Sequence, residues 1–547
     1  MATAPDWLGR AWRRVFRGGR TSRALAWAGA SVLALVLLAE AVSLVAAGPG
    51  RRRMEREVNS RLTGYSVRIG KLDLQLYRLA VSLSDVAIRQ QSNPDPPVAI
   101  LPRLHASIEW RALLHGKLVA DFLFERPQFH VDLTQAKTEA ASPVRLKDRG
   151  WQGAALAIFP LKINTLRIQD GKLTYIDEDP SHPLELTHAD FLAEDIRNIR
   201  SPARAYPSPV RLSAAVFESG RATVEGHADF FAEPNPGFHV RFDLRGIPLS
   251  SLQPVSHHAN LSVQGGVLSG RGETELAPGV RLATLSDLEI SGMTLDYVSD
   301  ATPASAPAPA PAPPPAPPEQ PGRDHLAMRI DRLRILRSEF GFQNRSKNPP
   351  YRVFVDQADF ELDGYDGAFG KRPATAKVSG RFMGSGPASA SLRIGVDHGK
   401  GPDLDLAVRI EDTDMRRLNR MWNAYGNFDV SAGEFSLYSE LHVRNGNVTG
   451  YVKPLFRDMR VADSAQDRPK GLFHKIYEGF VGLVAKLLEN RQRDEVATVA
   501  ELHGPIGKPR SSTLQVIGGL VQNAFFKAIL PGLQRNYELQ TKSPRPG

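Results

Sequence analysis

The stretch INTLRIQDGKLTYID, residues 163–177, contains two short runs in which apolar and polar side chains alternate. The apolar positions of these runs are Leu166 and Ile168, then Leu173 and Tyr175. Alternation with a period of two is typical of β strands, and the dipeptide Asp170-Gly171 between the runs tolerates the positive φ of a tight turn. The stretch therefore predicts a β hairpin.

The same spacing of apolar residues occurs four times in the chain. Counted from Ile69, Ile163, Leu285 or Ile330, large apolar side chains follow at the same four intervals. Outside the first stretch these positions are Leu72, Leu74, Leu79 and Val81; Leu288, Ile290, Leu295 and Tyr297; and Leu333, Ile335, Phe340 and Phe342. Repetition of one strand-pair pattern predicts an all-β chain built from repeats.

A longer period relates two halves of the chain. Ile163 corresponds to Ile330, Leu252 to Leu418 and Val263 to Val430, so that matching residues lie 166 or 167 positions apart. This offset predicts a tandem duplication, with β copies at residues 151–300 and 323–462 that follow an N-terminal β region at residues 58–150.

Between the predicted copies, residues 301–322 consist mainly of proline and alanine. Proline fixes φ and has no N–H to donate to a sheet, so we expect an extended polyproline linker here. Residues 463–547 carry apolar side chains at helical spacing, which predicts amphipathic helices separated by a short strand at residues 497–504. These helices would pack on the end of the sheet or contact a membrane surface.

Residues 24–47 are apolar except for Ser31, Glu40 and Ser43. As a helix this run would cross a bilayer core of about 30 Å. We therefore predict a single-pass transmembrane anchor at residues 24–47, a basic cytoplasmic segment at residues 1–23, and an exported body. A cleaved signal peptide and a twin-arginine signal are the alternatives.

The formal net charge is +10, and the chain has no cysteine. Ten arginines and only three acidic residues lie within residues 1–56, so most of the excess charge flanks the apolar run. This placement favours a membrane anchor over a nucleic-acid partner. The absence of cysteine excludes disulfides and thiolate metal sites.

Motifs for catalysis are absent from the sequence: it contains no G-x-S-x-G, H-E-x-x-H or P-loop pattern. The pair His257-His258 and the acidic clusters at residues 177–179 and 403–405 fit surface turns or solvated strand faces better than metal sites. We expect no enzymatic activity, no catalytic residue, no metal and no cofactor.

About 400 residues of alternating strands have few helical segments to cover them. Two sheets packed as a sandwich, or one long curled antiparallel sheet that forms an apolar groove, would satisfy this pattern. An open apolar groove costs about 25 cal/mol per Å² in water unless an apolar ligand such as a lipid acyl chain fills it. The predicted lining residues are Leu72, Leu74, Leu166, Ile168, Leu173, Tyr175, Leu288, Ile290, Leu333, Ile335, Phe340 and Phe342.

Five segments resemble the AsmA-like proteins, in particular their domain-of-unknown-function seven-four-eight branch. They are RLTGYSVRIGKLDLQLYRLAVSLSDVAIRQ, PPVAILPRLHASIEWRALLHGKL, FERPQFHVDL, GNVTGYVKPLFRD and GPIGKPRSSTLQVIGGLVQNAFFKAILPG. The resemblance implies a bacterial inner-membrane anchor, a periplasmic β groove, and a part in phospholipid transport or outer-membrane homeostasis. It supplies no catalytic residues. A non-enzymatic envelope scaffold that binds other envelope proteins and assists outer-membrane protein assembly is the alternative.

Overall fold

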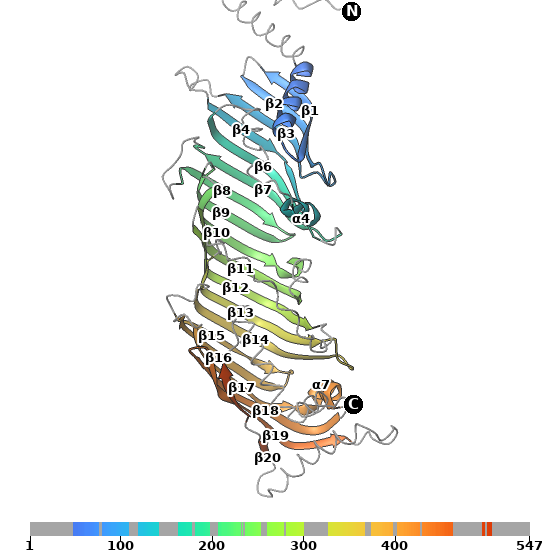
Figure 1. Cartoon of the computed structure of the whole chain (residues 1–547), viewed down its shortest axis with the longest axis vertical. Coiled ribbons are helices and arrows are strands. Elements are labelled where there is room, and N and C mark those ends of the chain that lie inside the picture. The colour runs from blue at the N-terminus through green and yellow to red at the C-terminus, as the bar shows by residue number, and fades with distance from the viewer. Residues whose placement is uncertain are drawn as a thin grey trace, which may run out of the picture. The chain divides into compact units, whose positions relative to one another are not determined.

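The computed structural model describes residues 47–462 with gaps, and residues 495–497 and 500–505. The gaps are 76–78, 109–118, 142–161, 178–180, 197–205, 231, 233–235, 253–259, 278–279, 300–326, 367–372, 398–401 and 427–428. The described residues are mainly β strand, which confirms the predicted fold class at this level. They fall into two compact units, unit 1 up to Val216 together with Thr223–Phe238, and unit 2 formed by Phe217–Ala222 and the chain from His239 onward (Figure 1).

Four predicted segments lie outside the described residues. They are the basic segment at residues 1–23, the anchor at residues 24–47 except for its last residue, the linker at residues 301–322, and the C-terminal helices. Within the described part of the chain, no helix is both long and apolar enough to cross a membrane. The short strand predicted at residues 497–504 is present as two strands, β20 (Glu495–Ala497) and β21 (Ala500–Pro505).

Unit 1 consists of a helix at residues 47–61 followed by a sheet. Its elements are β1 (Tyr65–Gln75), β2 (Ala80–Gln90), β3 (Ala99–Ile108), β4 (Val119–Glu125), β5 (Gln128–Asp132), α4 (Leu133–Ala141), β6 (Lys162–Ile176), β7 (Leu184–Glu194), β8 (Ser208–Val216) and, from Thr223, β9 (Gly220–Asp229). Strands β1 to β4 pair antiparallel in chain order, as do β6, β7 and β8.

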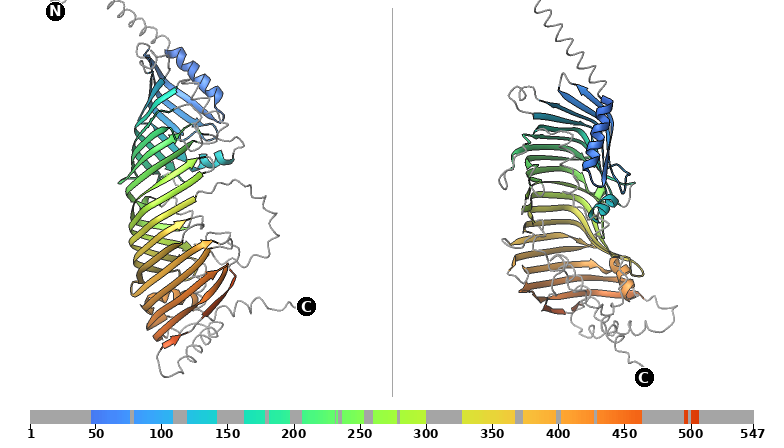
Figure 2. Two further views of the ribbon diagram at one scale, coloured as in Figure 1. Left: turned by 90° about the vertical axis from the view of Figure 1, so that its left-hand side faces the viewer. Right: turned by 45° about the horizontal axis from the view of Figure 1, so that its top comes forward.

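Unit 2 contains longer strands, whose sheet curls (Figure 2). Its elements are β10 (Gly237–Pro248, from His239), η3 (Leu249–Leu252), β11 (Leu261–Ala277), β12 (Val280–Ser299), β13 (Ala327–Asn344), β14 (Tyr351–Asp366), β15 (Ala374–Phe382), β16 (Gly386–Asp397), β17 (Pro402–Asp414), η5 (Met415–Leu418), α7 (Asn419–Gly426), β18 (Asp429–Arg444), β19 (Asn447–Ala462), β20 and β21. Strands β11 to β19 pair in chain order, and β20 and β21 both pair with β19.

The strand pairing is mainly antiparallel, which confirms the prediction from the sequence, but it includes parallel pairs that the sequence did not indicate. In unit 1, β4 and β5 run parallel to β6, and in unit 2, β12 runs parallel to β13. Parallel neighbours require a connection that carries the chain back along the whole strand. The chain between β12 and β13 runs through residues 300–326, which lie outside the described residues. The proline-rich stretch therefore joins neighbouring strands of one sheet.

The hairpin predicted at residues 163–177 is wrong, because these residues belong to the single strand β6. The corresponding stretches of β12 and β13 are also single strands, and only the stretch from Ile69 to Val81 forms a hairpin, between β1 and β2. The φ of Asp170 is 52°, and the register of β6 with β7 shifts beside it. A bulge of this kind moves the alternation by one residue, as a tight turn does. The sequence pattern is the same in both cases.

Residues with positive φ recur at the offset found in the sequence. Asp170 and Arg337 lie 167 positions apart, and Phe217 and Met383 lie 166 apart. The backbone N–H of Asp170 donates to the carboxylate of Asp190 at 3.1 Å, and that of Arg337 donates to the carboxylate of Asp359 at 2.9 Å. The two predicted copies therefore share the position of a bulge, and in each copy an aspartate of the next strand accepts the hydrogen bond from the N–H at the bulge.

Short helical segments cover parts of one face of each sheet. In unit 1, Val58 and Leu62 pack against a buried cluster on β1 to β4 that includes Ile69 and Leu83. In unit 2, the residues of η5 and α7 that are buried on the sheet are Met415, Leu418, Met421 and Trp422, and they pack against Phe435 and Tyr351. Segment η3 contributes Leu249 to a smaller cluster that contains Val263 and Ile335.

Candidate functional site

Apolar side chains form continuous rows across the strands of unit 1. Residues paired in register on neighbouring strands point to the same face of a sheet, so the pairing defines the rows. One row from β1 to β8 consists of Leu72, Leu83, Leu104, Phe124, Ile168, Phe191 and Leu212. The next row consists of Leu74, Val81, Ala106, Phe122, Leu166, Ala193 and Val210. Four predicted groove residues thus lie on one face.

Beyond the bulge in β6, the same face continues with Leu173 and Tyr175. These residues pair with Phe129 and Val131 of β5 on one side and with Leu186 and Leu184 of β7 on the other. Leu173 is 38% exposed and Val131 is 44% exposed, which places them among the most exposed large apolar residues described. This end of the apolar face is therefore open to solvent.

Unit 2 has equivalent rows. One consists of Leu268, Ile290, Ile335, Phe360, Val378, Ala390, Val408, Ser439 and Val452. A second consists of Leu288, Leu333, Leu362, Ala376, Leu392, Leu406 and Leu441. Phe340 and Phe342 belong to shorter rows with Leu295 and Tyr297, and the Phe342 and Tyr297 rings stack at 6.1 Å. The remaining six predicted groove residues therefore also share a face.

The predicted residues differ in how far they are covered. Leu72 and Ile335 are buried, under the helix at residues 47–61 and beside η3 respectively. In the middle of unit 2, Val378 and Leu392 are only half-buried, and so is Phe360, which packs against the cluster that contains Leu249 of η3. The short helical segments thus cover parts of the apolar face, and the parts between them are partly accessible to solvent.

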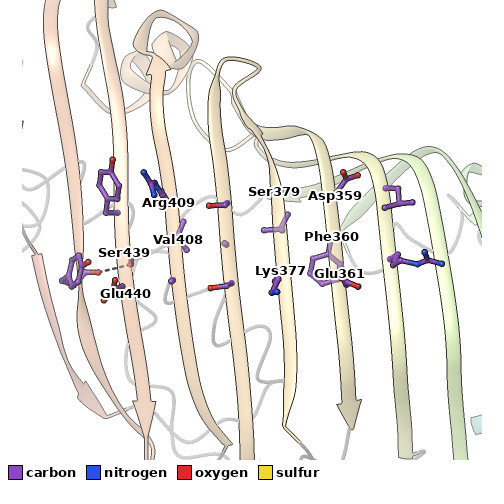
Figure 3. Close-up of a pocket in the computed structure, with 18 residues that line it drawn as sticks. Asp359, Phe360, Glu361, Lys377, Ser379, Val408, Arg409, Ser439 and Glu440 are labelled. Atoms are coloured by element: carbon purple, nitrogen blue, oxygen red, sulfur yellow. Dashed lines mark hydrogen bonds between the residues drawn. The ribbon is translucent and has the colours of Figure 1, made fainter.

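A cavity of about 770 Å³ lies across β13 to β19 of unit 2, and its lining includes Phe360, Val378, Ala390, Val408 and Ser439 of the first apolar row (Figure 3). Its floor is formed by small side chains on β15, β16 and β17, namely Ser379, Ser389, Ser391 and Ala407. Longer side chains form its walls, and those with charge are Arg334, Lys377, Arg409, Asp359, Glu361 and Glu440. None of the predicted groove residues lines this cavity. Small and long side chains thus alternate along β15 and β17, where Ser379 follows Lys377 and Arg409 follows Ala407 on the same face.

Two of the charged side chains of the cavity wall, Arg334 and Arg409, form ion pairs. Arg334 lies 3.1 Å from Glu289, and Arg409 lies 2.6 Å from Glu411, whose carboxylate also accepts a hydrogen bond from the Tyr438 hydroxyl at 2.8 Å. The hydrogen bond from Arg409 lowers the pKa of Glu411, and that from Tyr438 lowers it further. The hydrogen bonds from Arg409 and Tyr438 thus favour the ionised form of Glu411. Among the described residues, no group of His, Asp and Glu side chains could hold a metal ion.

An ion cluster on β12, β13 and β14 was not visible in the sequence. Arg352 donates to Asp296 at 2.9 Å and also binds Glu339, and it reaches them across Gly341, where a side chain would collide with Asp296. Burial opposes the charge of Arg352, but the hydrogen bonds to Asp296 and Glu339 raise the pKa of its guanidinium. Asp296 and Arg352 are 56 positions apart, so only the strand register brings them together.

The acidic pair at residues 403–405 lies on the polar face of β17. The imidazole of His442 is 2.8 Å from the Asp405 carboxylate, which also binds Arg444 of β18. The hydrogen bond from His442 lowers the pKa of Asp405; partial burial works in the opposite direction, and Arg444 lowers the pKa further. The pair is part of a cross-strand ion network, as a solvated face predicts. His257 and His258 lie outside the described residues.

This network predicts a pH-dependent contribution to stability. Because the pKa of Asp405 is lower in the folded than in the unfolded chain, its ionised form stabilises unit 2 above about pH 4, and this contribution is lost as the pH falls through the folded-state pKa. We expect Asp405→Asn to lower the free energy of unfolding at about pH 7 and to have almost no effect at about pH 2.5. Urea denaturation at both pH values measures this, with Asp458→Asn, at an exposed position of β19, as the control. Equal losses at both pH values would contradict the assignment.

No protein-family model and no curated protein matches this chain. The resemblance to AsmA-like proteins accordingly stays a prediction from the sequence.

Proposed function

We propose that this protein is an inner-membrane-anchored envelope protein whose apolar sheet face binds phospholipid acyl chains and takes part in phospholipid transport or outer-membrane homeostasis. The observation that carries the proposal is the continuity of the apolar rows. In each unit they cross neighbouring strands with few interruptions, and all twelve residues predicted to line a groove lie on them.

The energetics of the apolar face favour an extended hydrocarbon ligand. Each methylene group removed from water contributes about 0.8 kcal/mol, so ten methylene groups laid along a row would contribute about 8 kcal/mol before the costs of association. A binding site of this kind needs no specific polar contacts. The rows offer none, apart from single hydroxyls such as that of Ser439, which is satisfied by the carbonyl of Tyr451 at 3.0 Å.

The face of the sheet opposite the apolar rows is polar and suited to contact with water. Cross-strand ion pairs occur along it, for example Arg332 with Asp363 at 3.2 Å and Lys172 with Glu185 at 2.6 Å. A sheet with one charged and one apolar face can keep acyl chains on one side while the other side remains solvated. Acyl chains on the apolar face would be shielded from water by the backbone.

Photo-crosslinking tests this proposal directly. A benzophenone amino acid at Ile168, on the apolar face of β6, is expected to capture phospholipid in intact cells, whereas the same probe at the neighbouring Arg167, which is exposed on the other face, is not. Mass spectrometry of the purified full-length chain would quantify the adducts, and we expect at least a five-fold difference. Equal yields at the two positions, or protein adducts alone at Ile168, would overturn lipid binding and favour a scaffold.

A further inference from the structure

The helix at residues 47–61 lies along the outer edge of β1 (Figure 2). One edge of β1 pairs with β2. On its other edge, the carboxamide of Asn59 accepts from the N–H of Val67 at 2.7 Å and donates to the C=O of the same residue at 2.8 Å. Glu55 accepts from the N–H of Ile69 at 3.1 Å, and Arg51 donates to its C=O at 2.7 Å. Helical side chains thus occupy the positions of a neighbouring strand.

The two elements match in spacing. Arg51, Glu55 and Asn59 are four residues apart, so they follow one face of the helix at intervals of about 6.0 Å. Backbone groups that point outward from the same edge of a strand repeat at about 6.6 Å. Three side chains in this arrangement can bind both polar groups of two successive outward-facing residues of β1.

A similar arrangement occurs in unit 2, where Asn419 of α7 binds the N–H and C=O of Val430 at 2.9 and 3.0 Å. The pairing of β18 with β17 ends at Glu434, so Val430 lies beyond the reach of β17. In both units a helical asparagine binds backbone groups at a strand edge that no neighbouring strand covers at that position. Unpaired strand edges are the surfaces through which sheets associate, and covering them with a helix is one way to prevent this.

We infer that the helix at residues 47–61 is a removable cap, and that the edge of β1 beneath it is a docking surface for β1 of a second copy of this chain. Pairing of one strand with another supplies the same N–H and C=O partners that the helix supplies now. The inference does not depend on lipid binding, because it rests on the hydrogen bonds at the edge of β1. The helix also packs Val58 against Leu72 of the first apolar row.

The sequence of β1 favours its own copy as the partner. In an antiparallel pair centred between Gly70 and Lys71, Arg68 lies opposite Asp73 of the second copy, and Ile69 lies opposite Leu72. In this pairing, oppositely charged residues of the two copies face each other at the more exposed positions, and apolar residues face each other at the buried positions. Oppositely charged cross-strand pairs stabilise a sheet and like charges destabilise it, so the pairing can be tested by charge exchange.

The first experiment removes the cap from the full-length chain in mild detergent. Simultaneous replacement of Arg51, Glu55 and Asn59 by alanine is expected to convert a monomer into a dimer, as measured by light scattering after size-exclusion chromatography. The matched control replaces Arg52, Arg56 and Ser60, which have the same spacing but are exposed. It is expected to stay monomeric. A triple variant that folds but stays monomeric would overturn the docking surface.

Hydrogen exchange tests the cap itself. The amide of Val67 is expected to exchange at least ten-fold faster in Asn59→Ala, which is mild enough to fold if the triple variant does not, and no faster in Ser60→Ala. The amide of Ile69 is expected to respond in the same way to Glu55→Ala. Unchanged exchange would overturn the cap.

Charge exchange tests the partner and the register. In the uncapped chain, Asp73→Arg is expected to weaken the dimer at least ten-fold, because Arg68 then faces an arginine. The double change Arg68→Asp with Asp73→Arg is expected to restore it. A dimer that is insensitive to both changes would overturn pairing through β1.

Discussion

Replacement of Trp422 by alanine is expected to lower the free energy of unfolding of unit 2 by about 3–5 kcal/mol. Trp422 lies on α7 with 1% of its surface exposed, and it belongs to the largest buried cluster of the unit, with Met415, Met421 and Phe435. Its ring also contacts Phe456 of β19, edge to face, at a centroid distance of 6.4 Å. Truncation would leave a large cavity between α7 and the sheet, because the surrounding strands cannot collapse into it.

Urea denaturation followed by circular dichroism measures this loss, and hydrogen exchange of the β18 amides locates it. Arg420→Ala on the exposed side of α7 is the matched control, with an expected change within about 0.5 kcal/mol. If Trp422→Ala cost less than about 1 kcal/mol, α7 would not be an integral cover of the apolar face.

The second large effect is expected from Gly386→Ala, at the start of β16. A methyl group at this position would collide with the carbonyl oxygen of Glu411 and with the side chain of Thr413, and would lie 3.0 Å from the Cα of Thr413. Two of these atoms belong to the backbone of β17 and cannot rotate away. We therefore expect a loss of about 2–3 kcal/mol and a local displacement of β16 from β17.

Gly246→Ala separates steric collision from backbone conformation. Gly246 has a φ of 63°, and a methyl group on its Cα would meet no atom within 4 Å, so alanine there is expected to cost about 1 kcal/mol through φ alone. Thermal unfolding of both variants would compare the two costs. Equal losses would show that β16 and β17 can separate freely at Gly386.

The periodicity of the sequence predicted which residues share a face, because side chains alternate along any strand irrespective of its partners. The residues chosen from the repeated spacing, from Leu72 to Phe342, therefore lie on the apolar rows even though most of the stretches are single strands and not hairpins. A bulge at Asp170 and a turn such as that between β1 and β2 shift the alternation equally. The difference between them depends on pairing with a distant strand.

The alternation of apolar and polar residues by itself determined that this protein is built from β strands with one apolar face, and it determined which side chains form that face. Only the tertiary structure decided which strands run parallel, where the cavity of unit 2 lies, and how Arg51, Glu55 and Asn59 cover the edge of β1. These features depend on hydrogen bonds and contacts between residues far apart in the chain. Local alternation carries no information about such partners.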